Sequence, residues 1–333
     1  MRAFRNLDDA DLEVPAEGCV LVGLNGHGKT SLIEAFLYCE VFRSFRGAGD
    51  RELVRFGSDG FFVATDRVTA GFDARTRAKK VTVGGAEPVR MADAIGIIRG
   101  VVLSPGDVAL VAGGPRERRR YLDVMLSLTV KGYVEALRQY RRALKHRCRA
   151  TAAEMPVWER VLAEAGARVI SARAGWAEQW RHRYRERSEA MGESGEPRLD
   201  YAPSVTGDLL AALEKTRERD VARGRTSVGP HRDDLKLALN GRDLRTYGSA
   251  GQHRTAALAL RIAEAETLEA PTICLDDAFA ELDAERSRRL GAMIEAMAAS
   301  GKQVIAAVPK AEEVPRVFSG LPMRRIENGA VRA

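Results

Sequence analysis

Two short segments near opposite ends of the chain carry residues whose types and spacing suit phosphate and metal chemistry. Residues 23–30 follow the pattern G-x-x-x-x-G-K-[ST]. In this pattern glycine backbone N–H groups surround phosphate oxygens, the lysine reaches the outer phosphates and the hydroxyl binds Mg²⁺. The contacts expected for a bound nucleotide come from eight residues: Gly23, Asn25, Gly26, His27, Gly28, Lys29, Thr30 and Ser31.

The second segment, residues 272–277, is an apolar run that ends in two carboxylates. A side chain at the carboxyl end of a buried strand lies where α/β sheets bind ligands. We therefore expect Asp276 to hold Mg²⁺ together with the Thr30 hydroxyl. Asp277 points to the other face of the strand, so it is predicted to polarise the attacking water while Lys29 stabilises the phosphates.

A third segment, residues 247–252, places the pattern S-x-G-Q directly before a predicted helix. Taken alone it indicates only a helix N-terminus able to bind an anion. The order of phosphate loop, long insertion, S-x-G-Q, paired acids and the loop 280–283 resembles that of ABC-type ATPase heads. The resemblance implies that ATP binds between two copies of the chain. The resemblance further implies that Ser249, Gly251 and Gln252 act in trans, on the ATP bound by the other copy. It places Asp283 in the dimer loop.

The elements needed to position these residues can be read from the hydrophobic pattern. Short buried strands are expected at 20–22, 101–105, 272–276 and 303–308, and a hairpin at 324–331. Helices are expected at 31–42, from about 157 to the loop at 192–197, and at 205–222, 251–269 and 284–299, with further long helices between 116 and 149. The fold class predicted is α/β, an ABC-type ATPase head with an inserted, mainly helical second domain. The head comprises residues 1–112 and 226–333, and the helical arm comprises 113–225.

The composition indicates which kinds of molecule the protein can bind and where it is located. The 333 residues carry a net charge of +7 and a pI near 9.4, a balance that favours polyanions such as DNA. The four cysteines form no C-x-x-C pair, which is typical of reduced thiols in the cytoplasm. No signal peptide or stretch of about 18 apolar residues is present, so a cytoplasmic, nucleoid-associated location is expected.

One stretch is more basic than the rest. Residues 138–187 hold 13 Lys or Arg against 5 Asp or Glu, a larger excess than the whole chain has. Five basic residues recur there at helical spacing: Arg138, Arg141, Arg142, Lys145 and Arg149. Such a stripe is either a solvated helix face or a sequence-independent phosphate contact. Trp176, Trp180 and Tyr184 share one helical face, which suits core packing better than base stacking.

The chain resembles the RecF family of bacterial DNA-repair ATPases over nearly its full length. The matching blocks are residues 4–7, 25–35, 43–46, 104–107, 118–123, 229–235, 248–255 and 275–283. The resemblance implies an ATP- and Mg²⁺-dependent, DNA-stimulated slow ATPase that dimerises on DNA next to single-strand gaps. It also implies RecR and RecO as partners in RecA loading, recombinational repair, replication and the SOS response. Gly106 and the apolar run 306–309 depart from the family pattern, and the run leaves γ-phosphate sensing there in doubt.

Other functions fit less well. A structural head of the SMC type needs a heptad-patterned insertion of hundreds of residues, and 115–225 lacks sustained heptads. A transporter ATPase subunit does not account for the block G-P-H-R-D-D at 229–234 or for the basic stripe. An ATP-dependent DNA clamp that does not hydrolyse remains an alternative, because of the apolar run at 306–309.

Overall fold

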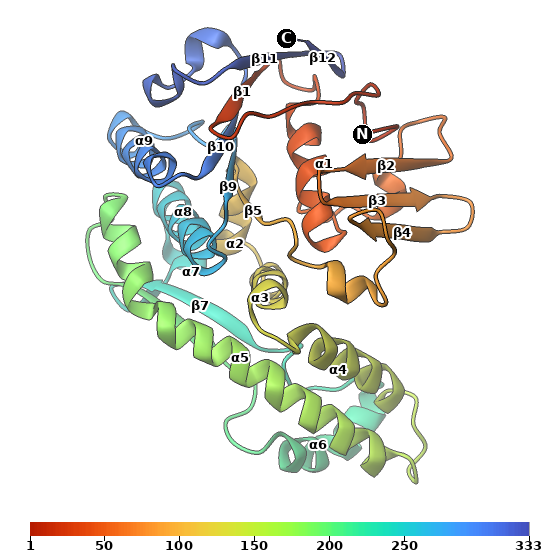
Figure 1. Ribbon diagram of the computed structural model, residues 1–333. Coiled ribbons are helices and arrows are strands. Elements are labelled where there is room, and N and C mark those ends of the chain that lie inside the picture. Colours follow the sequence, from red (N-terminus) through yellow and green to blue (C-terminus); the bar gives the residue numbers. More distant parts are fainter. Residues whose placement is uncertain (333) are drawn as a thin grey trace. The chain divides into compact units, whose positions relative to one another are not determined.

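The computed structural model describes residues 1–332, which form two compact units (Figure 1). The first unit comprises Met1–Asp107 and Glu264–Ala333, and the second, which we call the helical unit, comprises Val108–Ala263. Among the described residues no helix is long and apolar enough to cross a membrane.

A six-stranded sheet forms the centre of the first unit, in the order β12-β11-β1-β10-β9-β5. Its strands are β1 (Gly18–Val22), β5 (Gly100–Leu103), β9 (Thr272–Asp276), β10 (Gln303–Val308), β11 (Met323–Glu327) and β12 (Ala330–Arg332). All adjacent pairs are parallel except β11 with β12. Strands β1, β5 and β9 are buried along their whole length, so both faces of the sheet are covered.

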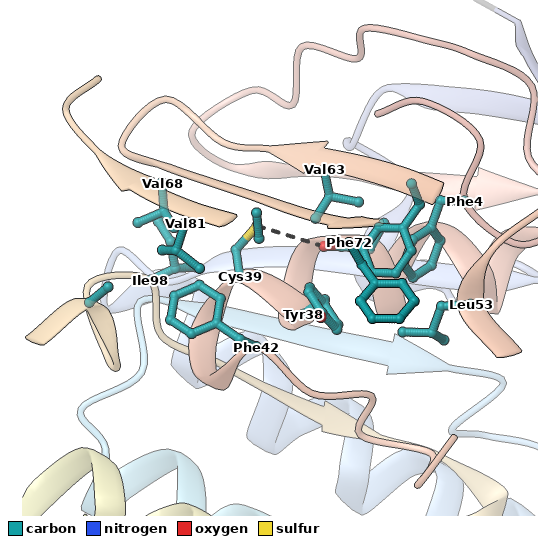
Figure 2. Packing of buried hydrophobic residues seen from close by; sticks show 14 of the residues in the cluster. Phe4, Tyr38, Cys39, Phe42, Leu53, Val63, Val68, Phe72, Val81 and Ile98 are labelled. Carbon is teal, nitrogen blue, oxygen red and sulfur yellow. Dashed lines mark hydrogen bonds between the residues drawn. The ribbon is translucent and has the colours of Figure 1, made fainter. Parts of the chain in front are cut away.

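Helix α1 (Lys29–Val41) lies between this sheet and a second one. The second sheet is antiparallel and contains β2 (Gly60–Ala64), β3 (Val68–Asp73) and β4 (Ala78–Val83). Ile33 and Leu37 pack toward the parallel sheet, whereas Tyr38, Cys39 and Phe42 belong to the cluster with Phe72 and Val81 (Figure 2). Because α1 is apolar on two sides, packing against both sheets holds the helix that begins at Lys29.

The remaining helices of the first unit are short apart from α9 (Ala284–Ala299). Single 3₁₀ turns occur at Asp50–Leu53, Met91–Ala94, Pro105–Val108, Ala311–Glu313 and Arg316–Phe318. The turn at Pro105–Val108 ends on the first residue of the helical unit.

The helical unit is built on α3 (Pro115–Thr129), α4 (Tyr133–Arg147), α5 (Met155–Ala190) and α6 (Leu209–Arg223). It also contains α2 (Ala109–Ala112), α7 (Leu244–Tyr247) and a three-stranded sheet of β6 (Pro197–Ala202), β7 (Asp234–Leu239) and β8 (Arg242–Asp243). Helix α8 (Ala250–Thr267) begins in this unit and ends in the first. Gly132, at φ +82°, separates α3 from α4, a break that helical spacing alone does not reveal.

Buried polar contacts hold α4, α5 and α6 together. Arg147, 3% exposed, binds Glu159 at 3.0 Å and Asp220 at 3.1 Å, so both of its partners are buried carboxylates. Trp176, Trp180 and Tyr184 are buried as well, which confirms the prediction of core packing.

Residues 226–263 pack with the helical unit, because β7 pairs with β6. The sequence-based division assigned these residues to the ATPase head. That functional assignment stays a prediction.

Candidate nucleotide site

The phosphate loop joins the carboxyl end of β1 to the first turn of α1. Gly26 and Gly28 have φ angles of +82° and +113°, a backbone conformation that favours glycine. The loop is exposed at Leu24, Asn25 and Gly26, and it becomes buried at Gly28 and Lys29. Its conformation therefore presents the exposed turn to solvent above the end of the parallel sheet.

Glycine is required at position 23 for a steric reason in addition to its place in the phosphate-loop pattern. A Cβ atom on Gly23 would lie 2.2 Å from the carbonyl oxygen of Ile326 in β11. The same carbonyl lies 3.3 Å from His27 Nδ1, and the N–H of Gly329 donates to the His27 carbonyl at 3.0 Å. The terminal hairpin thus contacts the phosphate loop at both ends, and Gly23 allows the close approach.

Lys29 and Thr30 occupy the first two positions of α1. Lys29 is 4% exposed, and its ammonium donates to the carbonyl of Gly23 at 2.6 Å and to that of Leu24 at 3.3 Å. The ammonium thus satisfies the loop's own carbonyls. The Thr30 hydroxyl donates to Asp276 Oδ1 at 2.8 Å across 246 positions of sequence. This hydrogen bond brings the phosphate loop and the paired acids together, whereas their role in binding a nucleotide stays a prediction.

Asp277 follows the last residue of β9 and leaves the strand. Its φ is +50°, which is uncommon for a residue other than glycine. Its N–H donates to the carbonyl of Ala307 at 3.2 Å, but its buried Oδ1 has no hydrogen-bond partner among the described residues. A strained backbone and an unsatisfied carboxylate oxygen are features that functional sites retain.

The electrostatics of the two acids suit a cation. Burial raises the pKa of Asp276, and the hydrogen bond from Thr30 opposes that shift. Burial also raises the pKa of Asp277, against the nearby charge of Lys29. A divalent cation would stabilise the ionised form of both carboxylates. Thr30 and Asp276 fit Mg²⁺, which is usually held by one or two carboxylates with substrate phosphates. Accordingly, the described residues contain no cluster of three His, Cys, Asp or Glu that could hold a metal alone.

A set of N-terminal side chains supports the loop from behind. Asn6 donates to the Gly26 carbonyl at 2.9 Å and accepts from the Ser31 hydroxyl at 2.9 Å. Arg5 forms two hydrogen bonds of 2.9 Å with Glu34, a carboxylate with 0% exposure. Arg5, Asn6 and Glu34 were not among the predicted site residues, although residues 4–7 are one of the blocks on which the family resemblance rests.

The S-x-G-Q turn lies in the helical unit and forms the N-terminus of α8. The N–H of Ser249 donates to Gln252 Oε1 at 2.9 Å, and the N–H of Gln252 donates to the Ser249 hydroxyl at 3.3 Å. This reciprocal pair is a capping box. Ser249 is exposed, so the positive end of an 18-residue helix faces solvent.

Asp283 caps α9. Its carboxylate accepts from the N–H of Arg286 at 2.8 Å and pairs with the Arg286 guanidinium. These hydrogen bonds hold the pKa of Asp283 below its ordinary value. Asp283 therefore orders the start of α9 in the single chain, and a role in a dimer loop would be additional.

The basic stripe is solvent-exposed. Four of its members, Arg138, Arg141, Arg142 and Lys145, lie on α4, whereas Arg149 follows the end of that helix at Arg147. All five are exposed, and Arg147 is turned into the core. Arg141 forms an ion pair with Asp123 at 2.9 Å. No ion pair involves Arg142 or Lys145 among residues 1–332. The same holds for Arg138 and Arg149, so among the described residues Arg141 alone of the stripe is held by a carboxylate and the other four can reach a phosphate backbone.

Known proteins share this arrangement of sequence and fold. The family model of the RecF/RecN/SMC N terminal domain matches residues 1–319. A DNA replication and repair protein RecF from Acidothermus cellulolyticus is 37% identical, over 86% of this chain and 87% of that protein. The RecF of Thermomicrobium roseum is 32% identical, over 98% of this chain and 96% of its own.

The chain belongs to the RecF family. The solved structure of the recombination mediator protein RecF with ATP, in the RecFOR pathway, has a TM-score of 0.88 and 29% identity. The match covers 99% of this chain and 94% of that one. An Smc head domain from Pyrococcus furiosus has a TM-score of 0.55 at 14% identity, which shows the fold alone. The predicted ABC-type head with a helical insertion is confirmed by these matches.

Proposed function

We propose that this chain is an ATP-dependent DNA-binding recombination mediator whose dimer forms when ATP binds. The observation that carries the proposal is the hydrogen bond from Thr30 to Asp276, which joins the two halves of the phosphate site at 2.8 Å. Membership in the RecF family and the ATP-bound structure of a RecF protein support ATP as the nucleotide.

Each residue of the site has a task in this proposal. Lys29 exchanges the carbonyls of Gly23 and Leu24 for phosphate oxygens, which are stronger acceptors because they are charged. Thr30 and Asp276 hold Mg²⁺, which neutralises phosphate charge when bound. Asp277 orients the attacking water through its unpartnered Oδ1. Hydrolysis is slow, since Asp277 is one methylene shorter than the glutamate usual in transporter heads.

Ser249, Gly251 and Gln252 complete the site from a second copy of the chain. The exposed N-terminus of α8 offers N–H groups and the positive end of the helix dipole to the γ-phosphate. Asp283 contacts the partner next to this turn. ATP then joins two chains, and its hydrolysis lets them separate.

The dimer clamps DNA next to single-strand gaps. The exposed arginines and lysine of α4 supply sequence-independent phosphate contacts. With RecR and RecO as partners, the clamp supports RecA loading, recombinational repair, replication and the SOS response. RecF relatives named for replication and repair support this role.

A second candidate is a clamp that binds ATP without turning it over. It is favoured by the end of β10, where Ala307 is the register partner of Asp276 and no hydroxyl or imidazole follows at 308–309. Measuring phosphate release with and without DNA distinguishes the two, because the clamp releases none in either condition.

The test of the main proposal is steady-state phosphate release in the presence of gapped DNA. Slow, DNA-stimulated release is expected from the natural chain, and Lys29→Arg should reduce it by about a hundredfold or more, because the longer guanidinium cannot take the ammonium's place on the phosphates. Lys131→Arg, at an exposed position, is the matched control and should leave the rate unchanged. An active Lys29→Arg variant would refute the site assignment.

A further inference from the structure

The terminal hairpin, β11 and β12, carries an arrangement of charges that the nucleotide site does not use. In the antiparallel register Arg325 lies directly opposite Arg332. Directly opposed residues on neighbouring strands share a face of the sheet, and like charges in this position destabilise the pair. The sequence retains two such charges where alternation with an acid would have been favourable.

The two arginines border an open hollow of about 360 Å³. Arg324 and Glu327 also line it, so the lining holds three guanidinium groups and one carboxylate. Glu327 lies 3.6 Å from Arg332. No carboxylate among residues 1–332 comes within ion-pair distance of Arg324 or Arg325. The lining therefore carries an excess of positive charge that the protein itself does not neutralise.

The hollow lies beside the phosphate loop, in the same unit. Arg325 is the register partner of Val22, the last residue of β1 before Gly23. The hairpin contacts the loop through the Ile326 carbonyl, and Gly329 donates to the His27 carbonyl at 3.0 Å. A ligand that moved the hairpin would therefore act directly on the backbone that holds the nucleotide phosphates.

We propose that Arg325 and Arg332 bind the phosphate backbone of DNA, and that the hairpin couples this contact to the phosphate loop. The proposal rests on the proposed DNA-binding function and names a second DNA surface in addition to α4. Arginine is suited to the contact because its planar guanidinium binds phosphate with two hydrogen bonds. Arg332 lies on the edge strand β12 and Arg325 on its neighbour β11, and both are exposed, so an extended polyanion can reach them.

The decisive variant is Arg325→Glu. It replaces a repulsive cross-strand pair with an attractive one, so the hairpin should fold at least as well as in the natural chain. Arg325→Gln removes the charge without reversing it. Arg67→Glu is the matched control, because Arg67 is an exposed arginine of the same unit in the turn before β3 and forms no ion pair among the described residues.

The measurement is DNA affinity with ATP and Mg²⁺ at several salt concentrations. For Arg325→Gln the slope of log K against log salt should decrease by about 1, as expected for one lost phosphate contact, and Arg325→Glu should lower it at least as much. Arg67→Glu should retain the natural slope. ATP affinity without DNA should be the same for all four proteins, whereas its enhancement by DNA should be smaller in both Arg325 variants.

Three results would overturn the inference. An unchanged salt slope in both Arg325 variants, with normal DNA binding by the natural chain, would reject the DNA surface and leave the proposed function intact. This is also the result expected if the hollow instead binds an acidic protein segment. Loss of ATP affinity without DNA would assign the hollow to the nucleotide. Absence of DNA binding by the natural chain with ATP would reject the proposed function and the inference together.

Discussion

Asp277 combines three unfavourable properties at one residue. It has a positive φ, a buried oxygen without a hydrogen-bond partner and a pKa raised by burial. Each property opposes folding. Their coincidence next to Lys29 and Asp276 supports the proposal that Asp277 orients the reacting water.

Asp277→Asn should separate stability from catalysis. Asparagine tolerates the positive φ and removes the buried charge, so the nucleotide-free variant should melt at a higher temperature than the natural chain at neutral pH. Phosphate release should be lost, because the amide cannot accept a proton from water. Thermal melting and phosphate-release assays on the same preparation check both effects. A variant that still turns over ATP would contradict the role of Asp277.

The stability difference should depend on pH with a defined sign. The folded-state pKa of Asp277 is raised, so the native chain retains a proton that the unfolded chain has already released. The stability of the natural chain should therefore fall as pH rises from the ordinary aspartate pKa to the raised one. The difference in melting temperature between Asp277→Asn and the natural chain should be small below this window and largest above it. A difference independent of pH would contradict the electrostatic explanation.

At this scale the sequence predicted the identity of the site residues better than their conformations. The pattern at 23–30 located Lys29, but its bond to the Gly23 carbonyl depends on the folded loop. The need for Gly23 could not be predicted, because it arises from the Ile326 carbonyl, some 300 positions away. Such long-range contacts leave no local pattern in the chain.

Among the elements, α8 presents the sharpest test of the composite site. Its first turn is closed by reciprocal hydrogen bonds between Ser249 and Gln252. Ser249→Asp retains a good cap and adds a negative charge at the positive end of the helix, so the single chain should be as stable as before. The same charge would face the γ-phosphate of a partner chain, and ATP-driven dimerisation should be lost.

The experiment compares Ser249→Asp with Ser249→Ala in sedimentation at saturating ATP. Ser249→Ala loses the cap, at a cost of about 1 kcal/mol, but adds no charge and should still dimerise. A Ser249→Asp dimer as stable as that of the natural chain would mean that α8 does not meet the phosphates of a second copy.

A separate prediction concerns the binding of DNA by helix α4. The double variant Arg142→Glu with Lys145→Glu should lower the salt slope of DNA binding by about 2, because neither residue has an ion-pair partner within residues 1–332. Arg160→Glu with Lys215→Glu changes the net charge equally at exposed positions of α5 and α6. Equal effects of the two pairs on the slope would show that net charge, and not the stripe, governs binding.

Element boundaries were predictable where one physical signal dominated. Strand β9 was predicted at 272–276 and is found there, because an apolar run that ends in acidic residues marks the carboxyl end of a buried strand. Strand β6 was missed, since Pro197–Ala202 follows a Gly- and Pro-containing loop and is stabilised by pairing with β7. The exposed and buried arginines of α4 follow helical spacing, in which Arg147 shares the face of Tyr140 and Ala143.

At the scale of the whole molecule, the proposed site needs three segments, and we propose that the third comes from a second copy of the chain. The phosphate loop and the paired acids lie in the first unit, and the S-x-G-Q turn lies in the helical unit. The order of motifs along the chain predicted this composite, and family membership supports it. The central claim is therefore that ATP joins two chains on DNA.

Sedimentation of the purified chain with gapped DNA, with and without ATP and Mg²⁺, tests this claim most directly. We expect monomers without nucleotide and a DNA-bound dimer with ATP, which Lys29→Arg and Ser249→Asp should each disrupt. A chain that remains monomeric on gapped DNA at saturating ATP and Mg²⁺ would contradict it.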